Sequence, residues 1–240
     1  MRATGIRGVM AVAVPAVLLT CAPRASAEFH LDVYSGAALT DNVELWISEM
    51  GLRGSTQGMK VDNSLVFGGR VGYWLGSLPW LGLAVDVFAF NPDLPQQTVQ
   101  SSIAGFSAAT GQALKLDLNV TAVSAELKAR LRLLKDAAYP YGRLQPYLLV
   151  GPTLFISTMR DTNNFVLPRQ SDTDTEAGIK AGAGVAFQIL PGIAVFGEYR
   201  VTHFSPTWGF KDSSVSPSAR FTLSTDVDTH QIVGGISFRF

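Results

Sequence analysis

Apolar and polar residues alternate along most of the chain beyond residue 27. Every second residue in these stretches is apolar, and this period of two is that of a β-strand with one apolar face. Eight stretches show it: Glu28–Leu39, Asn63–Leu75, Trp80–Phe90, Leu116–Leu134, Gly142–Phe155, Asp174–Ile189, Ile193–His203 and Asp226–Phe240. No segment has the 3.6-residue period of an amphipathic helix, so the pattern predicts an all-β fold.

The connections between these stretches alternate strictly in length. Three are short (Gly76–Pro79, Lys135–Tyr141 and Leu190–Gly192), and four are long and polar (Thr40–Asp62, Asn91–Lys115, Ser157–Thr173 and Phe204–Thr225). Outer-membrane barrels combine short periplasmic turns, long extracellular loops and an even number of strands. Only a closed barrel pairs every backbone polar group of a sheet inside hydrocarbon. We therefore predict an eight-stranded antiparallel up-and-down transmembrane β-barrel.

Charged residues recur on one face of the predicted strands. In one strand, Glu126, Lys128 and Arg130 alternate with apolar residues. An Arg or Lys on the lipid face at the bilayer midplane costs about 2–4 kcal/mol, so the charged face must line the lumen. The same argument predicts a lumen set of Asp32, Arg70, Asp86, Glu126, Lys128, Arg130, Glu176, Lys180, Glu198, Arg200 and Arg239.

The predicted lumen set has two interpretations. Its five acids and six bases nearly balance, and an eight-stranded barrel has an interior just wide enough for side chains to fill. This favours a plug of ion pairs, with Arg70 beside Asp86 across the Gly76–Pro79 turn. The alternative is an ion pathway or proton relay, which would make the protein a narrow pore.

Aromatic residues gather near both ends of the predicted strands. Those near the short turns are Tyr73, Trp74, Trp80, Tyr139 and Tyr141, and those at the opposite ends are Phe88, Phe90 and Phe155. Barrels in the outer membrane carry aromatic girdles at both interfaces. We therefore expect two girdles in contact with lipid.

The first 27 residues have the pattern of a cleaved secretory signal. Arg2 and Arg7 precede the apolar stretch Gly8–Thr20, and Ala25-Ser26-Ala27 is an A-x-A cleavage site. A lipoprotein signal ending at Cys21 is the alternative. We expect Sec-type export, removal of residues 1–27 and a barrel domain of residues 28–240, with no further domain.

Composition agrees with an exported membrane protein. Hydrophobic residues make up 47% and charged residues 16%, with a mean hydropathy of +0.22. Removing the three arginines of the signal (Arg2, Arg7 and Arg24) changes the net charge from 0 to −3. Nucleic-acid binding usually needs a basic patch or stripe, and neither charge state offers one, so we expect no nucleic-acid partner.

Three segments resemble the outer-membrane β-barrel domain family, the group of small OmpA- and OmpX-like barrels. They are Pro146–Pro152, Gly197–Thr202 and the C-terminal Thr229–Phe240. The resemblance implies a place in the Gram-negative outer membrane, among its lipid and lipopolysaccharide. It also implies that Phe238 and Phe240 present an assembly signal to the barrel-assembly machinery. We expect a monomer.

One tripeptide resembles a catalytic motif. His203-Phe204-Ser205 is similar to the His-x-Ser of outer-membrane lipid A deacylases, with Pro206 where those enzymes usually have Asn. A hydrolase would need an acid to orient the histidine, and Asp212, Asp226 and Asp228 are the candidates. The sequence has no phosphate loop, nucleophile elbow or metal-like histidine spacing, so we predict no enzyme, no cofactor and no metal.

The long loops are then the expected carriers of function, because binding residues usually sit on loops held by a rigid scaffold. Candidate contact residues are Trp46, Ile47 and Met50 in the first loop and Trp208 and Phe210 in the fourth. We predict a structural, adhesion or surface-interaction role, with a host or surface ligand bound by the loops. The alternatives are a lipid A deacylase using His203 and Ser205, and a narrow pore.

Overall fold

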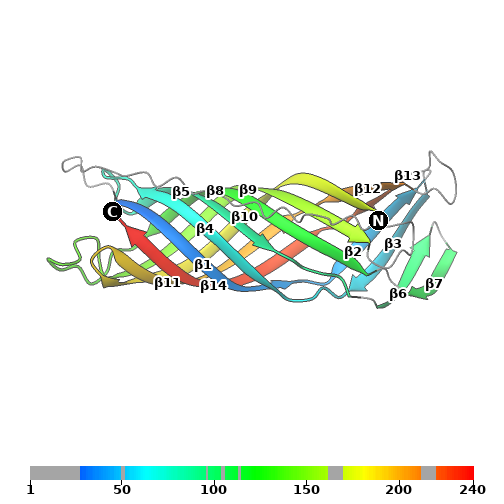
Figure 1. Ribbon diagram of the computed structural model, residues 1–240, viewed down its shortest axis with the longest axis horizontal. Coiled ribbons are helices and arrows are strands. Elements are labelled where there is room, and N and C mark those ends of the chain that lie inside the picture. Colours follow the sequence, from blue (N-terminus) through cyan, green and yellow to red (C-terminus); the bar gives the residue numbers. More distant parts are fainter. Residues whose placement is uncertain are drawn as a thin grey trace, which may run out of the picture.

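The computed structural model describes residues 28–49, 52–95, 97–103, 106–112, 115–161, 170–211 and 220–240. The predicted signal peptide, Met50 and Asp212 lie outside these residues. Every regular element in the described part of the chain is a β-strand. Figure 1 shows them arranged as one long cylinder whose strands cross its axis at a tilt.

Eight strands form a closed antiparallel barrel. They are β1 (Glu28–Thr40), β4 (Ser64–Trp74), β5 (Leu81–Phe90), β8 (Leu116–Arg130), β9 (Leu144–Asp161), β10 (Ser171–Leu190), β11 (Ile193–Phe204) and β14 (Val227–Arg239). Each pairs with the barrel strand before and after it, and β1 closes the circle on β14, with His30 opposite Arg239. The predicted up-and-down eight-stranded barrel is confirmed.

Six further strands form a second sheet beyond one end of the barrel (Figure 1). They are β2 (Val43–Glu49), β3 (Leu52–Met59), β6 (Thr98–Ile103), β7 (Phe106–Gln112), β12 (Thr207–Lys211) and β13 (Arg220–Ser224). Their order, β12-β13-β2-β3-β6-β7, repeats that of the barrel strands that they adjoin in sequence, β11-β14-β1-β4-β5-β8. The second sheet, which we call the extracellular sheet, therefore continues the barrel wall.

The prediction that the four long connections are loops is wrong over much of their length. Three contain the hairpins of the extracellular sheet. In the remaining connection, Ser157–Thr173, β9 runs to Asp161 and β10 begins at Ser171. The reason is that barrel strands hold their hairpin segments side by side, which favours continued pairing. Ser, Thr and Gly on the outer side, where there is no lipid, hide the alternation that marks the barrel strands.

The two faces of the barrel wall differ as the alternation predicts. Leu65, Phe67 and Val85 are exposed on the outside, with 73%, 59% and 55% of their surface accessible. Side chains at odd and even positions of a strand face opposite sides, so each side has its own parity. Arg70 and Asp86 have the inward parity on the same strands and are fully buried. Many of the hydrophobic residues of the chain therefore lie on an outer surface that faces lipid.

The interior changes character along the barrel axis. Phe88, Phe90 and Phe155 are buried in the lumen, where Phe155 stacks on Phe204 with ring centroids 4.2 Å apart. The predicted outer girdle is therefore wrong for these three residues. Trp74 is also buried, so its predicted place in the periplasmic girdle is wrong as well. Parity explains the correction, because Phe88 and Phe90 share the inward face of β5 with Asp86.

Candidate functional site

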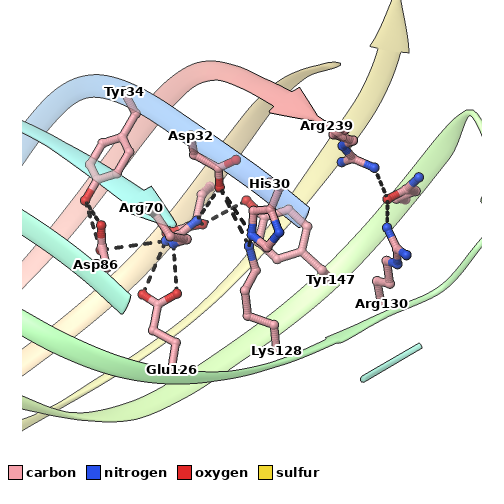
Figure 2. A network of polar contacts seen from close by, with 12 residues as sticks. His30, Asp32, Tyr34, Arg70, Asp86, Glu126, Lys128, Arg130, Tyr147 and Arg239 are labelled. Carbon is pink, nitrogen blue, oxygen red and sulfur yellow. Dashed lines mark hydrogen bonds and ion pairs between the residues drawn. The ribbon is translucent and has the colours of Figure 1, made fainter. Parts of the chain in front are cut away.

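Arg70 occupies the centre of the lumen among four carboxylates (Figure 2). Its guanidinium nitrogens lie 2.9 Å from Glu198, 2.8 Å from Glu126, 3.4 Å from Asp32 and 3.8 Å from Asp86. These acids come from four different strands, so one side chain of β4 joins opposite walls of the barrel. Asp86 lies directly opposite Arg70 in the β4–β5 ladder.

Two more cations complete the central cluster. Lys180 Nζ lies 2.5 Å from both Asp86 and Glu126, and Arg200 Nη1 lies 3.2 Å from Asp86. Tyrosine hydroxyls fill remaining acceptor positions on the carboxylates. Tyr34 donates to Asp86 at 2.7 Å, and Tyr147 donates to Glu198 at 2.8 Å. Their inward parity could have identified both tyrosines in the sequence.

A second cluster closes the periplasmic end of the lumen. Glu28 lies 2.5 Å from Arg130 and 3.0 Å from Arg239, and Gln145 accepts hydrogen bonds from both arginines. The Arg130 guanidinium lies 4.0 Å from the centre of the Trp74 ring, a cation–π contact. The lumen set omitted Glu28 because it is the first residue of its strand, where alternation is hardest to read.

Lys128 and His30 lie between the two clusters (Figure 2), and both contact the Trp74 ring, which also contacts Arg130. Lys128 Nζ lies 3.8 Å from Asp32 and 3.3 Å from His30 Nε2, and the His30 ring stacks on Trp74. Ten residues of the predicted lumen set thus join one network. The eleventh, Glu176, lies partly exposed on the inward parity of β10 and makes no ion pair with another described residue.

The network fills the barrel rather than lining a passage. Arg70, Asp86, Lys180 and Arg200 have no accessible surface. One void of about 10 Å³ lies beside His30 and Lys128, and another lies beside Trp208 in the apolar part. Each has room for about one water molecule. Between these small voids, the buried charges are matched by neighbouring side chains of opposite charge.

The predicted contact residues of the loops divide into two groups. Trp46 is exposed, with 38% of its surface accessible, and Ile47 is partly buried. Trp208 and Phe210 are buried, so their predicted exposure is wrong. They belong to β12, whose inward parity points both side chains over the outer mouth of the barrel. Trp208 Nε1 donates to the Ser157 carbonyl oxygen at 3.3 Å.

Two aspartates cap the edge of the extracellular sheet. The backbone amides of Thr207 and Gly209 on β12 donate to the carboxylates of Asp174 and Asp172, each at 2.7 Å. Both acids lie on β10, which thus contacts β12 through side chains in place of a main-chain ladder. An open edge strand is a template for unwanted pairing, and the carboxylates block this edge.

The candidate hydrolase residues are exposed at the extracellular ends of β11 and β14, with Ser205 directly after β11 and Asp226 directly before β14. His203 Nδ1 is 2.7 Å from Asp228 Oδ1, whereas the Ser205 hydroxyl donates to Asp226 Oδ1 at 2.6 Å. No hydrogen bond joins Ser205 to His203 in the described structure. The geometry supplies an acid for the histidine but not the serine–histidine bond of a triad.

A second histidine pair lies beside the first. The Tyr199 hydroxyl is 2.6 Å from His230 Nδ1, and His230 Nε2 is 3.6 Å from Asp41. Among the described residues, no group of three or more His, Cys, Asp or Glu side chains is placed so that it could hold a metal ion. Nor does any helix in the described residues have the length and apolar character to cross a membrane.

Acidic groups also gather near the β5–β6 connection. Asp93 Oδ1 accepts a hydrogen bond from the Leu118 amide at 3.1 Å. Burial raises the pKa of the Asp93 carboxyl above its ordinary value of 3.8, and the nearby Asp117 and Asp62 act in the same direction. The Leu118 hydrogen bond opposes this rise without cancelling it.

A closed barrel with an apolar outside and a charged, filled inside defines an integral outer-membrane β-barrel protein. The model of the outer membrane protein β-barrel domain family matches residues 12–240. The chain belongs to this family, and its place is the Gram-negative outer membrane. No curated protein sequence matches it.

Solved structures with a similar fold are other outer-membrane proteins. OprG from Pseudomonas aeruginosa is 13% identical with a TM-score of 0.55. The match covers 89% of this chain and 95% of the OprG chain. Neisserial surface protein A is 13% identical with a TM-score of 0.49, covering 88% and 97%. The protease OmpT from Escherichia coli is 7% identical with a TM-score of 0.44, covering 89% and 97%. At these identities, OprG supports the fold alone.

Proposed function

We propose that the protein is a sealed outer-membrane anchor that presents its extracellular sheet as an interaction surface. One observation carries the proposal: hairpins from three separate connections pair into a single ordered sheet that continues the barrel wall. Loops with no common structure would suffice to connect strands. A shared sheet holds side chains from all three hairpins at fixed spacing, as a binding surface requires.

The test is a chain in which residues 206–225 are replaced by a short turn, which removes β12 and β13 but leaves all eight barrel strands. We expect the variant to assemble in the outer membrane and to lose adherence of the expressing cells to a host-cell layer. Heat-modifiable migration on a gel checks that the barrel has folded. Undiminished adherence of the trimmed variant would overturn the proposal.

The narrow-pore alternative predicts a different result. A conducting lumen needs a continuous water path, and the buried network of Arg70, Lys180 and Arg200 leaves little room for one. We expect planar-bilayer recordings of the wild-type barrel to show no discrete conductance steps. Regular steps that change on substitution of Lys180 would favour the pore instead.

A hydrolase remains the second candidate because of the His203–Asp228 hydrogen bond. In that function Asp228 orients His203, and Ser205 must turn from Asp226 to donate to His203 Nε2. Mass spectrometry of lipid A from cells expressing the wild type, Ser205→Ala and Asp228→Asn distinguishes the two functions. Loss of one acyl chain only with the wild type supports the hydrolase, and an unchanged acyl number in all three excludes it.

A further inference from the structure

The outer face of the extracellular sheet carries a small ordered set of side chains around one exposed tryptophan. Trp46 lies between Ser224 of β13 and Ser55 of β3, and Ser48 lies between Thr222 and Arg53 on the same three strands. These six residues form two adjacent rows of three, which we call the Trp46 grid. Their partners on the opposite parity, such as Leu45 and Leu223, are buried in the interior.

The dimensions of the grid follow from sheet geometry. Side chains directly opposite one another are about 4.5–5.5 Å apart, and diagonal neighbours are about 7–8 Å apart. The grid therefore covers about 10 Å by 7 Å, close to the footprint of one or two sugar rings. Trp46 and Arg53 are diagonal neighbours, so an indole face and a guanidinium group can contact one ligand together.

The chemistry of the grid selects a class of ligand. An indole ring stacks on the C–H face of a pyranose, and the four hydroxyls of the grid can donate to or accept from sugar hydroxyls. Arg53 and Arg220, which follows Thr222 on the outward parity of β13, are both exposed and make no ion pair with another described residue. Arginine forks bind carboxylate and phosphate in bidentate fashion.

Local charge favours an anion at this place. The outer face of β13, β2 and β3 carries two described bases, Arg53 and Arg220, and one described acid, Glu44. Its net charge is therefore positive. Nearby extracellular residues are mostly acidic, including Asp41, Asp226 and Asp228. The grid and Arg220 thus form a basic, hydroxyl-rich and aromatic surface within an acidic end of the molecule.

The orientation of the face identifies the source of the ligand. The extracellular sheet continues the barrel wall, so its outer face points sideways, just beyond the lipid-facing surface of the barrel strands that it adjoins (Figure 1). A sideways face at this height meets the headgroups of the surrounding outer leaflet rather than another cell. We infer that the Trp46 grid with Arg220 binds the acidic saccharide headgroup of lipopolysaccharide in the same membrane.

This inference goes beyond the proposed function, since it gives the outer face of the extracellular sheet a ligand in the same membrane, and the two can fail separately. The adherence test reads contact with another cell, whereas the following test reads binding to a purified glycolipid. An anchor whose sheet touches only a host ligand would pass the first test and fail the second.

The experiment titrates the refolded barrel, held in phospholipid vesicles, with purified lipopolysaccharide that has a phosphorylated core. We expect the double variant Arg53→Gln/Arg220→Gln to bind at least tenfold more weakly than the wild type, and Trp46→Ala to weaken binding several-fold. Trp46→Phe should recover most of this loss because the ring is retained. Binding should weaken as salt rises, since exposed charges are screened.

Matched controls exist elsewhere on the surface. Arg160 on β9 is also exposed, and Trp80 at the periplasmic end has 50% of its surface accessible. Arg160→Gln and Trp80→Phe should bind lipopolysaccharide like the wild type, and heat-modifiable migration should show that every variant folds. Equal affinity of the grid variants and the wild type would overturn the inference. Binding of soluble dextran sulfate without binding of lipopolysaccharide would also overturn the inference, because the acidic saccharide would then come from outside the membrane.

Discussion

At the scale of single residues, Arg70 makes the largest testable contribution to the barrel interior. Removing one partner of a buried ion pair typically costs about 3–5 kcal/mol, because the remaining charge stays buried without compensation. Arg70 has four acidic partners. We expect Arg70→Met to lower the free energy of unfolding by at least this amount, measured by urea denaturation in lipid vesicles.

Arg160→Gln is the matched control for that measurement, because Arg160 is exposed and surface ion pairs contribute about 0–1 kcal/mol. Its unfolding free energy should stay close to that of the wild type. A similar small change for both variants would show that the lumen relaxes or hydrates around the loss of Arg70, and would contradict a tightly matched interior.

Asp93 provides a prediction about pH. Its carboxyl pKa is raised in the folded chain, so folding is favoured by this group at pH values below 3.8, and that contribution is lost as pH rises through the folded-state pKa. We expect an NMR titration of the Asp93 carboxyl carbon in micelles to have its midpoint above 3.8. A midpoint at or below 3.8 would contradict the dominance of burial over the Leu118 hydrogen bond.

Residue positions in the lumen could be predicted because a strand has a period of two and a charge on the lipid face is costly. The same parity placed Phe88 and Phe90 inside, yet the expectation of aromatic girdles placed them outside. The structure follows the parity. Glu28 was missed because alternation is hardest to read at the end of a strand, and Tyr34 because only charged residues were sought on the inward positions that it shares with Asp32.

At the scale of elements, the aspartate cap on β12 makes the extracellular sheet testable. Asp174→Ala removes the acceptor of the Thr207 amide, and Asp172→Ala removes that of the Gly209 amide. A hydrogen bond to a charged group contributes about 1.5–3 kcal/mol. We expect the double variant to raise hydrogen exchange at these two amides at least tenfold.

Exchange in the barrel strands should be unchanged, because the cap lies beyond the β10–β11 ladder, which starts at Ile179. Thr175→Ala, an exposed position on β10 next to the cap, serves as control and should leave the Thr207 and Gly209 amides protected. Equal exchange in the capped and uncapped chains would mean that β12 is held by its pairing with β13 alone.

The barrel strands could be read from the sequence, but the strands of the extracellular sheet could not. A barrel strand is apolar on one side for lipid and charged on the other for the lumen, which gives a strong alternation. The outer face of the extracellular sheet lies beyond the hydrocarbon and needs no apolar side chains, and its inner face contains residues such as Gly54 and Thr56 beside apolar ones. Those segments therefore have the composition of loops.

At the scale of the whole molecule, the predicted assembly signal at Phe240 can be tested separately from stability. Phe240 has 71% of its surface accessible, while its backbone exchanges two hydrogen bonds with Phe29. We expect Phe240→Ala to refold normally from urea into micelles but to reach the outer membrane of cells several-fold less, measured from the folded band on an unheated gel.

Phe67→Ala is the matched control, because Phe67 also faces outward, with 59% of its surface accessible, but lies inside β4. It should reach the membrane in wild-type amounts. Equal assembly of the Phe240 and Phe67 variants would contradict the role of the terminal phenylalanine as a signal to the assembly machinery.

The pairing of β1 with β14 has a consequence for the timing of synthesis. Those two strands are the first and the last of the described chain, so the cylinder has an open seam until the ribosome has produced both. Every earlier intermediate has an unpaired edge and an unbalanced set of inward charges, since Arg239 and its partner Glu28 come from opposite ends. A nascent chain of this protein cannot close its wall before β14 has been synthesised, and it must be kept from aggregating until both strands of the seam can pair.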